Sequence, residues 1–210
     1  MILSGVDPAL LDRITARTAE LETYCNDSRV TVEVVADELD AGGRVSRSTF
    51  VRFLETKRRG TITGREVLLA TEDGKDITAK KQRELGESKG ASAPSPFNRQ
   101  AREKYRFTSL PASNGSTAVR IAFEPLSPST ELMAGEATVD PETGEVLVMK
   151  MHPSKRPPLV DRVAIEVEFE AKTPVGRGVS KIIASGEGGF AFIRKRHRVV
   201  TTLSDYQPVH

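Results

Sequence analysis

Residues 163–170 read Val-Ala-Ile-Glu-Val-Glu-Phe-Glu, which is the clearest alternation of apolar and acidic residues in the chain. Successive side chains of a β-strand point to opposite faces of a sheet, so every second residue shares a face. The odd positions here are apolar, and glutamates occupy positions 166, 168 and 170. The stretch therefore predicts a strand with one buried face and one solvated, acidic face.

The same period of two recurs along most of the chain. Three consecutive strands, beginning at Arg29, Arg44 and Thr61, are separated by glycine turns at 41–43 and 58–60. Short turns between consecutive strands favour antiparallel pairing. Further strands are predicted at 105–110, 117–124, 135–140, 145–151, 160–170, 175–185 and 190–201. The glycine-rich run 186–189 is predicted to be the hairpin turn between the last two strands.

Two helices are predicted. Asp7 and Pro8 suit the cap and the first position of a helix over residues 8–25. Its apolar face is formed at helical spacing by Leu10, Ile14, Leu21 and Cys25. A shorter helix is predicted at 78–85. The following stretch, 86–96, is rich in Gly, Ser, Ala and Pro, and we predict a mobile loop there because it has few large apolar side chains to bury.

Together these elements predict one domain over residues 1–210 with a mainly β fold. A single large sheet or barrel can contain roughly 200–250 residues. About ten strands with an amphipathic helix at the front predict a strongly curved, mainly antiparallel sheet, with the N-terminal helix against its concave side and the short inserted helix beside it.

Composition excludes several classes of function. The 31 Lys and Arg residues and 29 Asp and Glu residues are interspersed and give a net charge of +2, which argues against nucleic acid as a partner. Cys25 is the single cysteine, so no intrachain disulfide can form. No run of eighteen apolar residues is present, so no transmembrane segment is predicted. The first residues do not read as an export signal, which leaves either the cytoplasm or removal of a signal.

The sequence shows no recognisable catalytic or metal-binding motif. His152, His197 and His210 are not at metal-ligand spacing from one another or from the cysteine. There is no nucleophile elbow and no P-loop, and the acidic turn at 72–76 does not have the alternating oxygen ligands of a calcium loop. We therefore predict no enzyme activity, no metal and no cofactor.

A basic run, Arg194-Lys195-Arg196-His197-Arg198, lies in the last predicted strand. Strand geometry places the three arginines on one face, with Phe190 and Phe192 upstream on that face. The run has two interpretations. It is either an ordinary solvated sheet face, or a basic rim beside an apolar cavity that suits an anionic head group or an acidic partner.

The order of elements and residues 135–147, Gly-Glu-Ala-Thr-Val-Asp-Pro-Glu-Thr-Gly-Glu-Val-Leu, resemble the bacterial lipoprotein-sorting (LolA-like) proteins and their relatives. In that group a strand ending in Asp-Pro-x-Thr-Gly turns back through the middle of the sheet. The resemblance implies an incomplete, half β-barrel covered by helices, whose hydrophobic cavity receives acyl chains in the periplasm.

From this we predict a periplasmic carrier or binding protein for an acyl chain or a lipoprotein, for which a membrane-bound donor or acceptor protein is a further candidate partner. The alternative is a cell-envelope protein-interaction module of the same fold with no ligand. The residues predicted to line the cavity, each of which could equally be ordinary core, are Phe50, Leu54, Phe107, Phe123, Leu147, Met149, Val167, Phe169, Phe190 and Phe192. The predicted basic rim consists of Arg194, Arg196 and Arg198.

Overall fold

The computed structural model describes residues 5–87, 94–111, 115–190 and 193–209. Within these residues, eleven strands form one sheet and two short strands form a separate hairpin. The strands of the large sheet are β1 (Ser28–Leu39), β2 (Val45–Arg58), β3 (Thr61–Glu72), β4 (Lys75–Asp76), β5 (Tyr105–Leu110), β6 (Val119–Pro125), β7 (Met133–Val139), β8 (Val146–Pro153), β9 (Val160–Glu168), β12 (Lys181–Phe190) and β13 (Ile193–Pro208). The hairpin is formed by β10 (Ala171–Thr173) and β11 (Gly176–Gly178). The helices are α1 (Pro8–Asn26), α2 (Thr78–Glu87) and a single 3₁₀ turn (Arg102–Lys104).

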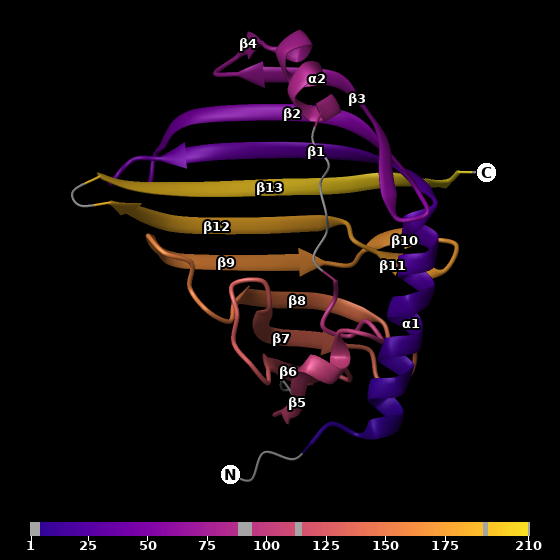
Figure 1. The fold of residues 1–210 in the computed structure, drawn as a ribbon. Helices are drawn as coiled ribbons and strands as arrows, with labels where there is room; N and C mark the ends of the chain where they lie inside the picture. The colour runs from indigo at the N-terminus through magenta and orange to yellow at the C-terminus, as the bar shows by residue number, and fades with distance from the viewer. Residues whose placement is uncertain (1–4, 88–93, 112–114, 191–192, 210) are drawn as a thin grey trace.

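The C-terminal strand joins two antiparallel meanders into one sheet. The strand order is β4-β3-β2-β1-β13-β12-β9-β8-β7-β6-β5, and every neighbouring pair is antiparallel. β13 lies between β1 and β12, near the centre of the curved sheet (Figure 1). The sheet does not close into a barrel, because β4 and β5 stand at opposite edges. The predicted mainly β fold with an open antiparallel sheet and two helices is confirmed.

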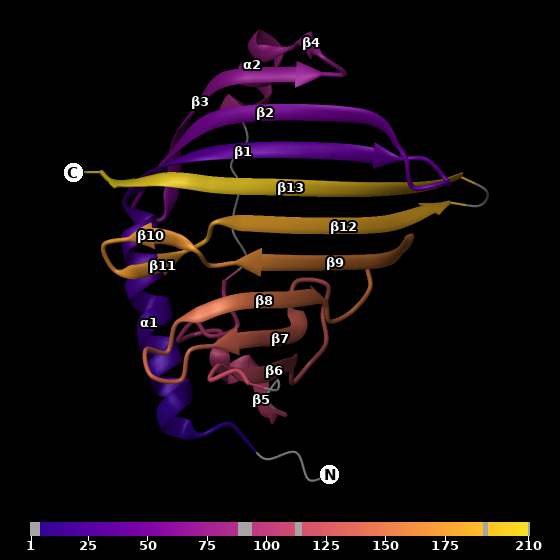
Figure 2. The ribbon, with the colours of Figure 1, turned by 180° about the vertical axis from the view of Figure 1, so that it is seen from behind.

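One face of the sheet carries both hydrophobic clusters. Directly paired residues of antiparallel strands lie on the same face. We call this face the covered face; it is marked by the register row Ile121, Ala137, Met149, Val167, Ile182, Thr201, Val34, Val51 and Ala70. A larger cluster under α1 spans β5 to β9, and a smaller cluster next to α2 spans β1 to β3. Over the opposite face, which we call the bare face, no helix of the described residues lies (Figure 2).

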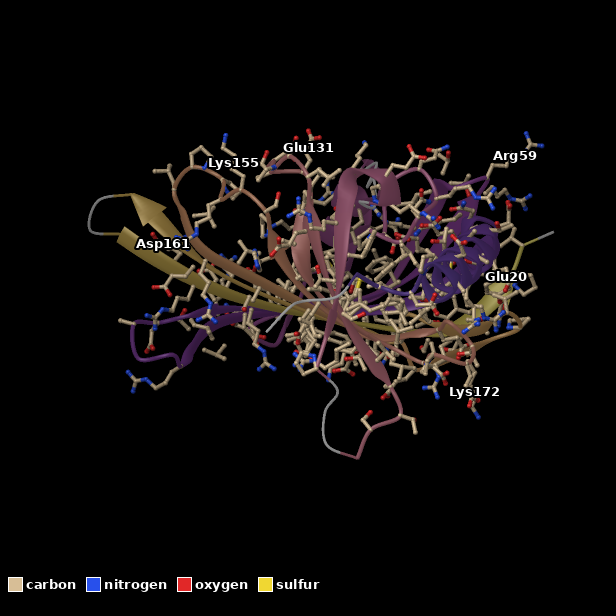
Figure 3. All side chains as sticks on the ribbon, turned by 90° about the horizontal axis from the view of Figure 1, so that it is seen from below. Glu20, Arg59, Glu131, Lys155, Asp161 and Lys172 are labelled. Carbon is tan, nitrogen blue, oxygen red and sulfur yellow. The ribbon has the colours of Figure 1, made fainter. Side chains whose placement is uncertain are left out.

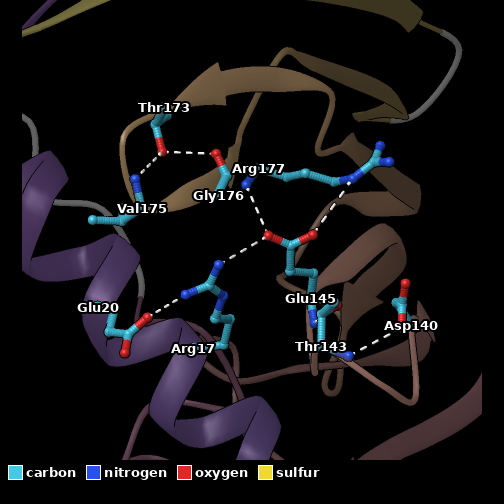
Figure 4. A network of polar contacts seen from close by, with 9 residues as sticks. All are labelled: Arg17, Glu20, Asp140, Thr143, Glu145, Thr173, Val175, Gly176 and Arg177. Atoms are coloured by element: carbon cyan, nitrogen blue, oxygen red, sulfur yellow. Dashed lines mark hydrogen bonds and ion pairs between the residues drawn. The ribbon is translucent and has the colours of Figure 1, made fainter.

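Helix α1 is attached by a few apolar side chains and by many polar contacts. Asp7 caps it by accepting from the Ala9 N–H at 3.1 Å, and Pro8 begins it, as predicted. Among its apolar side chains only Leu10 and Ile14 are buried. On its other side Arg17 binds Glu145 at 3.3 Å, and Glu145 also accepts the backbone N–H of residue 177 at 3.2 Å (Figure 4). Glu145 therefore ties α1 to both the β7–β8 turn and the β10–β11 hairpin.

The Asp-Pro-Glu-Thr-Gly turn between β7 and β8 fits closely beneath α1. The Asp140 carboxylate accepts the backbone N–H groups of Glu142 at 2.8 Å and Thr143 at 3.1 Å, and these bonds lower the pKa of that carboxyl below its usual value. Gly144 has a φ of +74°, and a Cβ there would lie 2.8 Å from Cγ of Arg13. Glycine is thus required both by the turn and by the approach of the helix.

Helix α2 closes the edge of the sheet at β3. The side-chain amide of Gln82 imitates a strand partner: its Oε1 accepts the Val67 N–H at 2.7 Å, and its Nε2 donates to the Arg65 carbonyl at 3.0 Å. The Thr78 hydroxyl accepts the Ala70 N–H at 2.9 Å. An uncovered strand edge can pair with another chain, so this helix protects the sheet against edge-to-edge association.

Three sequence predictions about local structure need correction or lie outside the described residues. The run 186–189 is not a turn: it lies inside β12, where Gly188 pairs with Val160 at a register shift and a Cβ would lie 2.5 Å from the Leu159 carbonyl. The predicted strand 175–185 is divided between β11 and β12. Within the predicted loop 86–96, residues 88–93 lie outside the described residues, while Gly86 and Glu87 end α2.

Candidate functional site

Five of the predicted cavity residues lie together on the covered face, but they are packed. Phe123 has no exposed surface, and Met149, Val167 and Phe169 are 5–8% exposed in the same cluster, with Phe107 packed against it. The ring of Phe97 stacks on Phe107 at 5.3 Å between centroids and meets Phe123 edge-on at 6.1 Å. The segment that carries Phe97, together with α1, therefore fills the space over these residues. Leu147 is partly buried, and its carbonyl accepts the Phe169 N–H at 2.9 Å.

The structure places Phe50 and Leu54 on the bare face, so the prediction that they share a face with the other five is wrong. In β2 both alternating sets contain apolar residues. Val51 and Phe53 are each 7% exposed and form the smaller cluster. Arg52 lies between Phe50 and Leu54 on the other face and binds Glu33 there at 2.7 Å. The side chain of Phe190 and all of Phe192 lie outside the described residues.

Two members of the predicted basic rim can be placed. Arg196 and Arg198 are exposed and lie on the bare face of β13, opposite Glu187 and Ser185 of β12. Arg196 binds the Glu187 carboxylate at 3.2 Å and donates to the Ala41 carbonyl at 3.4 Å. The side chain of Arg194 lies outside the described residues.

An open depression lies where β8 and β9 separate. These strands are paired from Val148–Glu168 to Met151–Ile165. Beyond that point β8 continues beside β7 to Pro153, whereas β9 pairs only with β12, and residues 154–159 connect the two strands. The result is an open groove of about 840 Å³, which we call the fork groove. Its lining combines side chains from both faces of the sheet.

The fork groove is largely apolar with a basic mouth. Its apolar walls include Leu110, Met151, Val160, Val163, Ile165 and Ile183. Two of its carboxylates are already paired: Glu136 binds Arg120 at 2.6 Å and Glu166 binds Lys150 at 3.6 Å. Arg156, Arg162, His152 and Asp161 are exposed around the groove. Such a combination suits an apolar chain that ends in an anionic group.

A second, smaller depression of about 220 Å³ lies on the covered face at the ends of β1, β2 and β13. It is polar, since Arg47 and Glu72 bind each other within it at 2.5 Å and His197 lines it. In the part of the chain that the structure describes, no three His, Cys, Asp or Glu side chains are grouped so as to hold a metal ion. None of the helices described there is long and apolar enough to cross a membrane.

Sequence reasoning did not find the fork groove. The available signal was the run 152–158, His-Pro-Ser-Lys-Arg-Pro-Pro. Proline cannot donate to a strand ladder, so three prolines so close together indicate that the pairing of two neighbouring strands ends there. The groove itself depends on how far β8 and β9 diverge, which no local pattern specifies.

No family model matches the chain, and no curated protein matches it either. Among solved structures, a putative outer membrane lipoprotein-sorting protein domain from Vibrio parahaemolyticus is 14% identical, with 94% of this chain and 91% of that chain covered at a TM-score of 0.42. The chain is similar to LolA-superfamily structures. One from Nitrosomonas europaea is 10% identical, covering 95% of this chain and 93% of its own at 0.42. A DUF1329 family protein from Desulfovibrio piger is 14% identical, covering 98% and 94% at 0.42.

Proposed function

We propose that this protein binds a single acyl chain, of a lipid or a lipoprotein, in the fork groove between β8 and β9. The observation that carries the proposal is an open groove of about 840 Å³ with aliphatic walls and basic side chains at its mouth. Binding sites for small molecules are typically about 300–1,000 Å³ and mainly apolar, with a few polar groups that fix orientation. The aliphatic walls would hold the chain, and Arg156 and Arg162 would hold its anionic end.

The expected affinity is moderate, which suits a carrier. Each buried methylene contributes about 0.8 kcal/mol, so a chain of about fourteen methylenes gains about 11 kcal/mol if fully buried. Association costs about 4–15 kcal/mol in lost freedom, and the groove is open on one side. The net affinity should therefore be micromolar or weaker, and the chain should exchange readily. We propose binding and transfer in the periplasm, without catalysis.

Filling the groove tests this function. Ala164 lies in the groove wall and is half-buried, so Ala164→Phe would occupy the space that the ligand needs. Ala36 is half-buried in β1 and lies outside the groove, so Ala36→Phe is the matched control. We expect Ala164→Phe to weaken binding of a fluorescent fatty acid at least tenfold, and Ala36→Phe to leave it unchanged.

A second variant, Ser185→Phe, places a ring in the same groove from β12. It shows whether an effect of Ala164→Phe comes from filling the groove or from a local disturbance of β9. Both filled variants should retain the circular dichroism spectrum of the wild type. Unchanged fatty-acid binding in both of them, with the fold intact, would exclude the fork groove as the site.

A protein-interaction role is the second candidate, and one observation favours it. The predicted cavity residues around Phe123 are packed beneath α1 and Phe97, as a protein core is. Native mass spectrometry of gently purified protein distinguishes the two roles. A mass increment that corresponds to a lipid, lost in Ala164→Phe, supports the carrier; a wild-type protein without lipid that also fails to bind added fatty acid supports the interaction module.

A further inference from the structure

The end of the sheet that lies away from α1 combines exposed basic and exposed aliphatic side chains. We call this end the distal rim. Register places its parts side by side: Val45 pairs with Leu39, Leu39 with Arg196, Arg196 with Glu187 and Glu187 with Arg162. The loop 154–159 adjoins them, because the Gly189 N–H donates to the Leu159 carbonyl at 3.0 Å. Figure 3 shows Lys155 and Asp161 at this end and Glu20, Arg59 and Lys172 at the other.

The distal rim has a local excess of positive charge. Its exposed basic side chains are Lys155, Arg156, Arg162, Lys195, Arg196 and Arg198. The carboxylates of Asp37, Glu38, Asp161 and Glu187 lie among them, since Asp37 pairs directly with Arg198 and Glu38 with His197. Asp40 and Arg44 neutralise each other nearby at 3.1 Å. Six cations against four carboxylates leave an excess of positive charge. The chain as a whole has a net charge of only +2, so this excess is a property of one end of the molecule and not of its composition.

Two aliphatic side chains stand among these cations with most of their surface exposed. Leu159 is 64% exposed and Val45 is 56% exposed. Leu159 also has a φ of +63°, a conformation that is unfavourable for a leucine. The turn that the Val160 N–H closes by donating to the Pro157 carbonyl at 3.3 Å sets this backbone conformation. The leucine side chain at that position remains exposed. Both residues lie at strand ends or in a loop, where they can enter an apolar layer without disturbing the sheet.

We propose that the distal rim docks this protein on an anionic phospholipid surface. Leu159 and Val45 enter the interfacial layer, and the surrounding Lys and Arg side chains bind the lipid phosphates. Surface-binding segments combine aliphatic anchors with basic residues in this way, and attraction to anionic lipids adds to apolar burial. A protein interface buries a contiguous apolar core, whereas Val45 and Leu159 are single aliphatic side chains set among cations, which suits insertion between lipid head groups.

Docking on a lipid surface and binding of a ligand in the fork groove are separate properties, although both use the same end of the molecule. Arg156 and Arg162 belong both to the distal rim and to the mouth of the fork groove. A protein docked through the rim therefore presents the groove mouth to the acyl layer. The docking inference itself rests on the exposed side chains of the rim and does not require that the groove bind a ligand.

The test is co-sedimentation of the full chain with vesicles at low salt. The vesicles contain either phosphatidylcholine alone or phosphatidylcholine with phosphatidylglycerol. Lys195→Gln/Arg198→Gln removes two rim charges, and Lys104→Gln/Lys172→Gln removes two exposed lysines elsewhere. We expect binding only to the anionic vesicles, weakened by salt. We expect it to be about 25-fold weaker in the rim variant, since each basic residue near an anionic surface contributes about fivefold, and nearly unchanged in the control.

The aliphatic anchor has its own variant. Asn tolerates a positive φ better than Leu does. Leu159→Asn therefore removes the apolar group without adding backbone strain. It should weaken vesicle binding about tenfold. Lack of wild-type binding to anionic vesicles overturns the proposal, as does equal weakening in the rim and control variants. Binding to an acidic polypeptide in place of vesicles would identify a protein partner and would also overturn it.

The groove variants keep the two proposals distinct. Ala164→Phe should still bind anionic vesicles, and the Lys195→Gln/Arg198→Gln variant should still bind fatty acid in solution. If vesicle binding fails while fatty-acid binding persists, only the docking proposal is lost. If fatty-acid binding fails while vesicle binding persists, only the fork groove is lost as a site.

Discussion

Replacing Phe123 by alanine tests whether the covered face is a packed core or a ligand cavity. Phe123 has no exposed surface and lies between the rings of Phe97, at 6.1 Å, and Tyr105, at 6.2 Å. Truncation of a buried Phe to Ala costs about 3–5 kcal/mol, because apolar contacts are lost and a cavity is left. The aromatic pairs contribute about 0.5–1.5 kcal/mol beyond burial, which places Phe123→Ala toward the upper end of that range.

This loss of stability is large compared with the total free energy of unfolding. Folded domains are stable by about 5–15 kcal/mol, so the variant should lose a third or more of its free energy of unfolding. At this chain length each kcal/mol lowers Tm by about 2–4 °C, so Tm should fall by about 10–20 °C. Urea denaturation followed by circular dichroism measures the free energy, and its m-value should not change.

Phe50→Ala is the matched control, because Phe50 is half-buried on the bare face. It should cost only about 0.8–1.5 kcal/mol, half of the gain from full burial of a Phe. Equal losses at the two positions would refute the assignment of faces. A near-normal stability of Phe123→Ala together with altered fatty-acid binding would refute the packed core and would restore the predicted cavity beneath α1.

Two further predictions concern backbone contact and pH. Gly135→Ala should destabilise the protein by about 2 kcal/mol or more in thermal melts, because the added Cβ would lie 2.0 Å from the Lys150 carbonyl oxygen of β8. Gly64→Ala in β3 is the control. Nothing lies within 4 Å of a Cβ there, so its stability should be nearly unchanged. Burial raises the pKa of Tyr206, whose hydroxyl donates to the Val179 carbonyl at 2.8 Å. The folded state then keeps a proton that the unfolded state loses near pH 10, so this contribution to stability is present below pH 10 and falls as pH rises toward the folded pKa. Urea melts between pH 8 and pH 11.5 should show a weaker alkaline loss in Tyr206→Phe, and an unchanged slope would contradict the assignment; Tyr24 and Tyr105, whose pKa values are also raised, should retain part of it.

The sequence by itself determined those features that depend on neighbouring residues. The alternation at 163–170 specified β9, whose apolar side is buried at Val167, and Phe169 is buried directly after the strand ends. Asp7 and Pro8 specified the start of α1. Short glycine turns specified the antiparallel meanders. In each case the signal and the structure lie within a few residues of each other, so local sterics and hydrogen bonding suffice.

Only the tertiary structure decided which surfaces are covered and which remain open. In β2, Val51 and Phe53 point to one face of the sheet, and Phe50 and Leu54 point to the other. Both pairs are apolar, so the alternation in the sequence does not show which pair is covered by another element. The run 186–189 has the composition of a turn, but pairing with β9 and β13 on either side holds it in a strand. The fork groove and the distal rim arise where distant strands diverge or end together. These features follow from pairing between segments far apart in the chain, and the free energy of that pairing is set by the assembled sheet rather than by any local stretch.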